Sequence, residues 1–398
     1  MVAVAPPAAT VTAAPGRVLP LLVAAQFLGV SPWFAVNAVM PELQRAHGWA
    51  PEAVGPLTSA VQLGFIAGTL LFALLAVADR FPARQVFLAC ALASAASTIA
   101  ALFSAGDFHA LFAWRALTGF CLAGIYPVGM KIAAQWFPRG LGAALGWLVG
   151  ALVLGSALPH ALRALTAGVG GWPWQAVFVA IAVASVAAGA LVIGGVPEPH
   201  HAPARVATLQ WRALGSVWTD RKVRASVLGY FGHMWELYAM WVLLPFVLAT
   251  RLHGTALSWM AFAALGAGAL GCALGGRVAQ RLGSARVAGT QLAVSGLCCV
   301  AAPWLLDAPA PLFYAWLVVW GITVAGDSPQ FSALTAANAP PQAVGSVLTL
   351  TNSIGFALSI VSIQLFVALL PSVPLAQLLP WLGIGPLLGL FALRPLLR

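Results

Sequence analysis

The sequence predicts an all-α integral membrane protein with twelve transmembrane helices arranged as two six-helix bundles. Of its 398 residues, 61% are hydrophobic and only 7% are charged. Apolar runs of roughly 20 residues, the length that crosses a bilayer as a helix, alternate with short polar breaks. In lipid every backbone N–H and C=O must find its partner within the segment, which favours helices. We therefore expect lipid to surround most of the chain.

The expected spans are bounded by charged residues, glycines and prolines. They cover residues 18–40, 52–77, 85–105, 108–130, 140–164, 172–195, 224–249, 255–279, 285–306, 309–333, 342–368 and 374–396. Residues 1–16 contain no Lys or Arg and therefore lack the charged start of a cleaved signal peptide. We expect residues 1–17 to form a cytoplasmic tail and the first span to insert uncleaved.

The basic residues are divided unevenly between the two sets of loops. With a cytoplasmic N-terminus, fifteen Lys and Arg residues fall on the cytoplasmic side, three fall on the other side, and Arg115 lies within a span. Cytoplasmic loops are enriched in Lys and Arg, so both termini are expected in the cytoplasm. The Ala-rich, Lys-poor composition is typical of a GC-rich bacterial gene, which predicts a multi-pass protein of the bacterial cytoplasmic (inner) membrane.

A hydrophilic linker divides the chain into two similar halves. We expect this linker over residues 196–223, between an N-terminal bundle (18–195) and a C-terminal bundle (224–398). Four residues of the fourth span recur in the tenth at a constant offset of 202: Gly119, Ala123, Gly124 and Pro127 correspond to Gly321, Ala325, Gly326 and Pro329. Such repetition is typical of transporters built from a duplicated six-helix unit.

A loop motif is also repeated, at nearly the same offset. The chain reads Ala78-Asp79-Arg80-Phe81-Pro82-Ala83-Arg84 after the second span and Gly276-Arg277-Val278-Ala279-Gln280-Arg281-Leu282-Gly283-Ser284-Ala285-Arg286 after the eighth. Both copies resemble the loop signature of the major facilitator superfamily. The first copy has Leu75 and Pro82 where the family has glycines, and the second has Gln280 in place of the acid.

This resemblance implies a conformational latch on the cytoplasmic side. The carboxylate of Asp79 would accept hydrogen bonds from Arg84 or from a helix N-terminus when that side is closed. The expected members of the latch are Asp79, Arg80, Arg84, Arg277, Arg281 and Arg286. The alternative is that these are ordinary basic loop residues.

Other features extend the resemblance over nearly the whole chain. Arg115-Ala-Leu-Thr-Gly119 resembles the R-x-x-x-G element of the superfamily. Gly142, Gly146 and Gly150 place small residues on one helix face, for which close helix packing is the simpler explanation. The first and seventh spans are loosely similar to those of bacterial cyanate and nitrate permeases. The arginines and the glycine-rich signature of the nitrate carriers are absent, which disfavours nitrate.

Three ionisable side chains inside the spans point to proton coupling, because such groups are costly in lipid and mark transport pathways. Glu236 lies near the centre of 224–249, three residues after His233, so the two can share a helix face. Asp327 is expected near the cytoplasmic end of 309–333. We predict that Glu236, His233 and Asp327 couple protons. The structural alternatives are a buried hydrogen-bonded pair that fixes the seventh span and, for Asp327, a helix-end residue at the interface.

A second set of side chains is expected to bind the substrate. Arg115 lies about 10 Å into the fourth span at the helical rise of about 1.5 Å per residue. There it could bind an anion, pair with Glu236 or with another helix end, or serve packing alone. The resemblance implies that the first and seventh spans line a central cavity. The expected substrate-binding residues are Arg115, Trp33, Asn37, Tyr126, Trp235 and Tyr238.

These observations favour a secondary transporter that moves a small organic solute, anionic by the presence of Arg115, by proton-coupled symport or antiport with alternating access. Proton-driven efflux of lipophilic solutes and a non-transporting membrane sensor are the alternatives. The chain has no phosphate-binding loop, nucleophile–base pair, metal-ligand spacing or nucleic-acid-binding basic stripe. We therefore expect a monomer without enzymatic activity, bound cofactor or metal, whose partners are its substrate and the bilayer.

Overall fold

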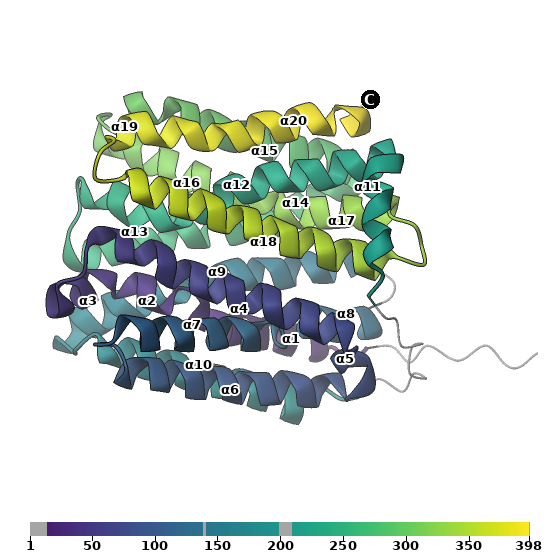
Figure 1. The fold of residues 1–398 in the computed structure, drawn as a ribbon, viewed down its shortest axis with the longest axis horizontal. Helices are drawn as coiled ribbons and strands as arrows, with labels where there is room; N and C mark the ends of the chain where they lie inside the picture. The colour runs from purple at the N-terminus through teal and green to yellow at the C-terminus, as the bar shows by residue number, and fades with distance from the viewer. Residues whose placement is uncertain (1–13, 138–140, 199–208, 398) are drawn as a thin grey trace, which may run out of the picture.

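The structure consists of long helices that run side by side. The computed structural model describes residues 14–137, 141–198 and 209–397, and over these residues it contains helices and no strand. Twelve helical segments within them are long and apolar enough to cross a membrane. The first six lie in one half of the molecule and the last six in the other (Figure 1). The predicted fold class is therefore confirmed.

The N-terminal half contains the first six spans, and proline interrupts the first of them. Pro32 cannot donate a backbone hydrogen bond, and the chain forms a 3-10 turn, η1, at this point. The elements of this half are α1 (Val18–Gly29), η1 (Ser31–Phe34), α2 (Ala35–Ala38), α3 (Met40–His47), η2 (Pro51–Ala53), α4 (Val54–Leu74), α5 (Val77–Arg80), α6 (Ala83–Phe103), α7 (Phe108–Leu122), α8 (Tyr126–Trp136), α9 (Leu141–Gly170) and α10 (Gln175–Gly195).

The C-terminal half contains the last six spans, of which the seventh is one unbroken helix. Its elements are η3 (Trp211–Leu214), α11 (Gly215–Thr219), α12 (Arg221–Ala249), α13 (Gly254–Gly266), α14 (Gly268–Leu282), α15 (Ser284–Leu305), α16 (Ala310–Gly326), α17 (Ser328–Asn338), α18 (Val344–Leu369), α19 (Leu375–Leu378), η4 (Leu379–Gly383) and α20 (Ile384–Leu397).

The repeated glycines and prolines break the fourth and tenth spans at equivalent places. The fourth span is divided between α7 and α8, and the tenth between α16 and α17. Pro127 and Pro329 occupy the first turn of α8 and α17, where the missing N–H has no intrahelical partner to lose. The sequence repeat is therefore a repeat of helix breaks, and each break lies beside the central cavity described below.

Two glycines of the repeat allow close helix contact inside each half. A Cβ atom on Gly119 would lie 1.9 Å from the carbonyl oxygen of Val61, and one on Gly321 would lie 1.8 Å from that of Ala264. Both distances are far below van der Waals contact, so these positions exclude any larger residue. The glycines hold α7 against α4 and α16 against α13.

Two pairs of spans join the halves. The fifth span, α9, lies against α13 and α14, and the second span, α4, lies against α18. The atom nearest to a Cβ built on Gly150 is the carbonyl oxygen of Ala269 in α14, at 3.3 Å. Gly150 on the small-residue face of α9 therefore serves packing between the halves.

The tenth span extends further than the sequence indicated. Its helices cover Ala310–Asn338 instead of 309–333, and Asp327 is fully buried in the middle of the span. The expectation that Asp327 lies near the cytoplasmic end of the span was wrong, because Asp327 lies at the internal break between α16 and α17. The polar residues Gln330 and Ser332, which follow it, line the cavity described below.

Part of the expected linker is helical. The segment from η3 to α11 precedes α12, which begins at Arg221. The tail residues 1–13, the linker residues 199–208, and the basic residues Arg139, Arg205 and Arg398 lie outside the described residues. The division into bundles at 195 and 224 stays a prediction.

Candidate functional site

A cavity of about 950 Å³ lies between the two halves. It reaches one end of the molecule, where Asp79, Lys131, Gln280, Ser284 and Gln342 line it. We call this end the basic end, because the arginines of the loops after the second and eighth spans lie there together with Lys131 of α8. In Figure 1 it is the side of α5, α8 and α11.

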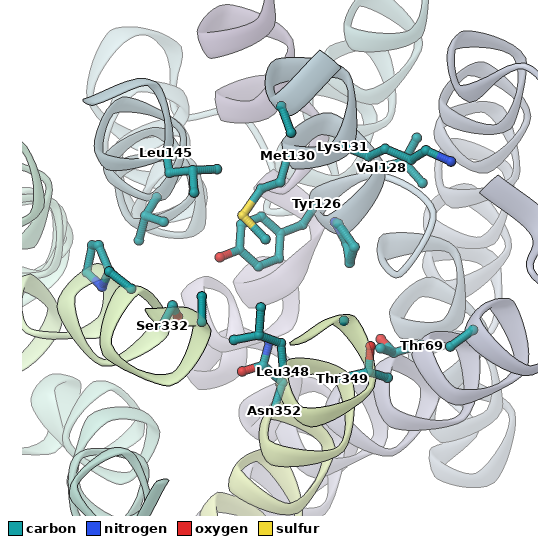
Figure 2. Close-up of a pocket in the computed structure, with 18 of the residues that line it drawn as sticks. Thr69, Tyr126, Val128, Met130, Lys131, Leu145, Ser332, Leu348, Thr349 and Asn352 are labelled. Atoms are coloured by element: carbon teal, nitrogen blue, oxygen red, sulfur yellow. The ribbon is translucent and has the colours of Figure 1, made fainter. Parts of the chain in front are cut away.

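Both halves contribute side chains to the cavity wall. Tyr126 and Met130 project from α8 on one side, while Leu348 and Asn352 project from α18 on the other (Figure 2). The breaks in the fourth and tenth spans reach the wall as well, because Pro127 and Pro329 line it. A solute in this cavity would therefore contact both halves at once.

The cavity lining combines apolar side chains with neutral hydrogen-bonding groups. The polar groups are hydroxyls and amides, including those of Thr69, Gln330, Ser332, Thr349 and Asn352. Its charged members among the described residues are Asp79 and Lys131, which pair with each other. Of the predicted substrate-binding residues, Tyr126 is the one that lines this cavity.

A cluster of aromatic rings closes the cavity at the other end. We call Trp33, Phe34, Phe65, Tyr238, Trp241 and Phe356 the aromatic plug. The centroid of the Trp33 ring lies 5.0 Å from that of Phe65, 5.6 Å from Phe356 and 5.9 Å from Tyr238. Phe65 also lines the cavity, so the plug is its floor. Sequence reasoning found Trp33 and Tyr238 and missed the rings that join them.

Further contacts at this end, one of them within the plug, also cross between the halves. Phe34 packs edge-on against Trp241 at 5.5 Å, and the Gln364 amide donates to the Ser59 hydroxyl at 2.7 Å. Asn37, predicted to bind substrate, instead donates to the Thr58 hydroxyl at 2.8 Å within the N-terminal half. The molecule is thus open at the basic end and closed at the opposite end.

Arg115 holds the broken part of the first span and does not line the cavity. Its guanidinium donates to the carbonyl oxygen of Pro32 at 2.7 Å and to that of Trp33. The side chain is 1% exposed. It makes no ion pair with Glu236 and no contact with the cavity in this conformation, and its partners belong instead to the 3-10 turn η1 at the break in the first span. The arginine fixes the backbone that carries Trp33 and Phe34.

Glu236 is buried inside the C-terminal half, where three donors converge on one of its oxygens. Its Oε1 accepts from the Ser295 hydroxyl at 2.5 Å, the Trp320 indole at 2.7 Å and the Cys299 thiol at 3.1 Å. Its Oε2 has no partner among the described residues. The donors come from α15 and α16, so this carboxyl group links three spans.

His233 contacts Asp327 and not Glu236. The Nδ1 atom of His233 lies 2.8 Å from Oδ1 of Asp327, and both side chains are 1% exposed. The pair has the distance of an ion pair, although its angles do not make a hydrogen bond. The expected His233–Glu236 pair does not form, because residues three apart on α12 point at different neighbouring helices.

Trp235 lies away from the cavity. Its indole N–H donates to the carbonyl oxygen of Trp381 at 3.4 Å, and its ring packs against Phe366 at 5.9 Å. It is partly exposed on the outside of the C-terminal half. The expectation that Trp235 lines the cavity is contradicted here, because its position on α12 faces α18 and η4.

In the predicted latch, Asp79 does not pair with Arg84 as expected. Asp79 pairs with Lys131 at the cavity mouth, whereas Arg84 donates to the carbonyl oxygen of Ile193 at 2.6 Å. Lys131 is one of two lysines in the chain, and this rarity could have identified it from the sequence as a candidate partner of Asp79. Both partners belong to the N-terminal half.

The remaining latch arginines make few contacts. Arg277 lies over the Trp147 ring, 5.7 Å from its centroid, and thereby joins α14 to α9 across the halves. Arg80, Arg281 and Arg286 are exposed and make no ion pair with another described residue. In this open conformation the latch is therefore reduced to the Asp79–Lys131 pair and one cation–π contact.

A comparison with protein families decides the classification. The family model described as Major Facilitator Superfamily matches residues 22–363. The chain belongs to the Major Facilitator Superfamily. Membership in this superfamily supports transport as the activity, in agreement with the prediction that the protein is a transporter and not an enzyme. The looser likeness to cyanate and nitrate permeases stays a prediction.

Two known proteins show how this member of the superfamily relates to others. The chain is 27% identical to the niacin transporter NiaP of Acinetobacter baylyi over 244 residues, which are 54% of this chain and 55% of that protein. The match thus spans about half the length of the curated relative. The crystal structure of the human organic anion transporter MFSD10 (TETRAN) superimposes with a TM-score of 0.73 and 16% identity, covering 95% of this chain and 100% of that one. At this identity the likeness shows the fold alone.

Proposed function

We propose that this protein is a proton-coupled carrier of a small organic acid that works by alternating access. The observation that carries the proposal is one cavity between the two halves, open at the basic end and closed at the other by the aromatic plug. Alternating access requires such a site to be exposed to one side at a time. Rocking the halves would separate Trp33 and Phe34 from Tyr238 and Trp241 while closing the mouth.

The orientation follows from the basic loops. We infer that the basic end faces the cytoplasm of a bacterial cell, because Lys and Arg are concentrated on that side. The conformation described above is then inward-open, with both termini in the cytoplasm. The cavity is formed within one chain, which supports transport by a monomer.

The proposed substrate is a small, largely apolar monocarboxylate. The cavity walls offer the Tyr126 ring and the hydroxyl and amide groups of Thr349 and Asn352. Among the described lining residues the one cation is Lys131, which lies at the mouth with Asp79, where an incoming carboxylate would meet it. The distant relationship to a niacin transporter supports an aromatic acid as the first compound to test.

The proposed proton sites lie behind the cavity wall, in the C-terminal half. Glu236 and the His233–Asp327 pair are buried acids and a base within spans that belong to the lipid interior, where ionisable groups are costly and normally serve transport. The unpartnered Oε2 of Glu236 is the atom at which this carboxyl could hold a proton without losing its three donors. Asp327 adjoins the cavity through its neighbours Pro329 and Gln330.

Uptake by purified protein in proteoliposomes tests this proposal. Radiolabelled nicotinate and benzoate should accumulate when the vesicle lumen is more alkaline than the medium, and a protonophore should abolish accumulation while leaving exchange intact. Vesicles that contain the Gly321→Leu variant serve as the inactive control, because position 321 has no room for a side chain beside Ala264. Equal accumulation with and without the pH gradient would contradict proton coupling. A lack of both uptake and exchange would contradict the substrate class.

A second candidate is the efflux of lipophilic solutes. It is favoured by the largely apolar lining and by the pairing of the two charged lining residues. Binding of tetraphenylphosphonium to the detergent-solubilised protein, competed by other lipophilic cations and not by nicotinate, would select this function over carboxylate transport.

A further inference from the structure

A short helical segment lies across the basic end of the molecule. The elements η3 and α11 run in succession from Trp211 to Thr219, and Figure 1 shows them crossing the ends of the spans instead of running along them. We call residues 211–219 the surface helix. Because α12 begins directly after it and enters the membrane, the surface helix lies at the depth of the lipid headgroups.

One face of the surface helix is fixed to the C-terminal half. Ala213 and Val217 are buried in a small hydrophobic cluster with Val347 and other residues of α12 and the start of α18. The backbone N–H of Gln210, just before the surface helix, donates to the Ser346 hydroxyl at 2.9 Å. The surface helix is therefore an ordered part of the fold.

The opposite face combines exposed tryptophans with basic residues. Trp211 is 52% exposed and Trp218 is 73% exposed. Arg212, Arg221 and Lys222 are exposed beside them. The one acid nearby is occupied, because the Asp220 carboxylate accepts from the backbone N–H of Lys222 at 2.7 Å and of Val223 at 3.2 Å. The outward face is thus aromatic and positively charged.

We propose that this face is a binding site for anionic phospholipid headgroups. Tryptophan rings favour the membrane–water interface, and each basic residue near an anionic leaflet strengthens binding roughly five-fold, equivalent to about 1 kcal/mol. The two exposed indoles supply the interfacial preference, and the three exposed cations next to them in the sequence supply the attraction to anionic lipid. The position at headgroup depth selects a lipid over a soluble partner.

The site also touches the mouth of the cavity. Ser346, which accepts the Gln210 hydrogen bond, and Leu209, which precedes Gln210, both line the cavity. The surface helix is therefore joined by this hydrogen bond to the cavity wall at the start of α18. This connection does not depend on which solute the cavity accepts.

Tryptophan quenching in nanodiscs tests the site directly. The full chain is reconstituted in phosphatidylcholine nanodiscs containing brominated phosphatidylglycerol or, at the same fraction, brominated phosphatidylcholine. The Trp218 signal is taken as the difference between the wild type and Trp218→Phe. We expect brominated phosphatidylglycerol to quench this signal more strongly than brominated phosphatidylcholine.

Two triple variants distinguish a specific lipid site on the surface helix from a general attraction of anionic lipid to the positive charge of the basic end. Replacing Arg212, Arg221 and Lys222 by Gln should abolish the preference for phosphatidylglycerol. Replacing Arg80, Arg281 and Arg286 by Gln removes the same charge from exposed positions at the same end and should preserve it. Gel filtration verifies that both variants are folded.

Three results would overturn the proposal. Equal quenching by the two brominated lipids in the wild type would show no headgroup selectivity. Equal loss in the two triple variants would show that net charge alone is responsible. A Trp218 signal that water-soluble acrylamide quenches and brominated lipids do not would place the surface helix in water, free for a soluble partner.

Discussion

The two halves of this protein bury charge in different ways. In the N-terminal half, Arg115 is held by backbone carbonyl oxygens of Pro32 and Trp33. In the C-terminal half, Glu236 is held by side-chain donors, and Asp327 lies against His233. Backbone partners cannot take up or release a proton, whereas His233 and the carboxyl groups can. The proposed division of roles is therefore gate positioning in the first half and proton handling in the second.

The two positions are not equivalent by sequence symmetry. The offset of 202 that relates the breaks in the fourth and tenth spans would place the counterpart of Arg115 at Leu317, which is buried and apolar. Asp327 instead lies at the break itself. The duplicated unit therefore provides the same helix geometry twice, and each half has placed a different charge on it.

The largest effect is expected from Arg115→Met. The substitution leaves two buried carbonyl oxygens without their charged donor, and hydrogen bonds to charged groups contribute about 2 kcal/mol each. We expect a loss of about 4 kcal/mol in the free energy of unfolding, together with loss of transport. Thermal unfolding in detergent measures it, and Arg45→Met, whose side chain is 76% exposed, should leave stability unchanged. Equal effects of the two variants would contradict the anchoring role.

A smaller effect is expected from the side-chain pair of the C-terminal half. Asp327→Asn keeps the volume and an acceptor oxygen, so we expect about 2 kcal/mol of destabilisation, below the cost of removing a buried partner outright. His233→Gln should cost a similar amount, and the double variant should cost less than the sum of the two. Additive values in this double-mutant cycle would show that the two residues do not act together.

The cavity walls should contribute more evenly from the two halves. Tyr126→Phe and Asn352→Ala each remove one neutral hydrogen-bonding group from opposite walls. Each should raise the half-saturation concentration for transport by up to about ten-fold, the equivalent of one net hydrogen bond. Unfolding temperatures should stay unchanged. An effect confined to one wall would show that the solute binds to one half only.

The smallest effect is expected at the cavity mouth. The Asp79 and Lys131 side chains are 25% and 26% exposed, so solvent screens the pair and its contribution to stability should be at most about 1 kcal/mol. Lys131→Gln should leave the unfolding temperature nearly unchanged and reduce the rate of uptake of an anionic solute. Faster anion uptake in Lys131→Gln would contradict a role for this cation.

The sequence predicted the spans well, because apolar length alone determines what crosses a bilayer. Its errors arose where a polar residue faces an internal cavity. The segment from Ser328 to Asn338 mixes polar with apolar residues, and the predicted span ends within it at residue 333, but the whole segment forms the helix α17 beside the cavity. No pattern within the tenth span distinguishes these two cases.

Side-chain partners were harder to predict than helices. His233 and Glu236 lie three residues apart on α12, yet their partners come from the tenth span in one case and from the ninth and tenth in the other. The same holds for Asp79, which pairs with Lys131 across 52 residues and not with the nearby Arg84. Such partners depend on how helices rotate against each other, which local spacing does not determine.

Glu236→Gln provides the most direct test of proton handling in the C-terminal half. Glutamine keeps the size of the side chain and an oxygen for the Ser295, Cys299 and Trp320 donors, but it cannot release a proton. In proteoliposomes containing a pH-sensitive dye, we predict that nicotinate drives proton flux in the wild type and not in Glu236→Gln, while exchange of labelled for unlabelled nicotinate continues. Undiminished proton flux in Glu236→Gln would contradict the assignment and leave the carboxyl a structural role.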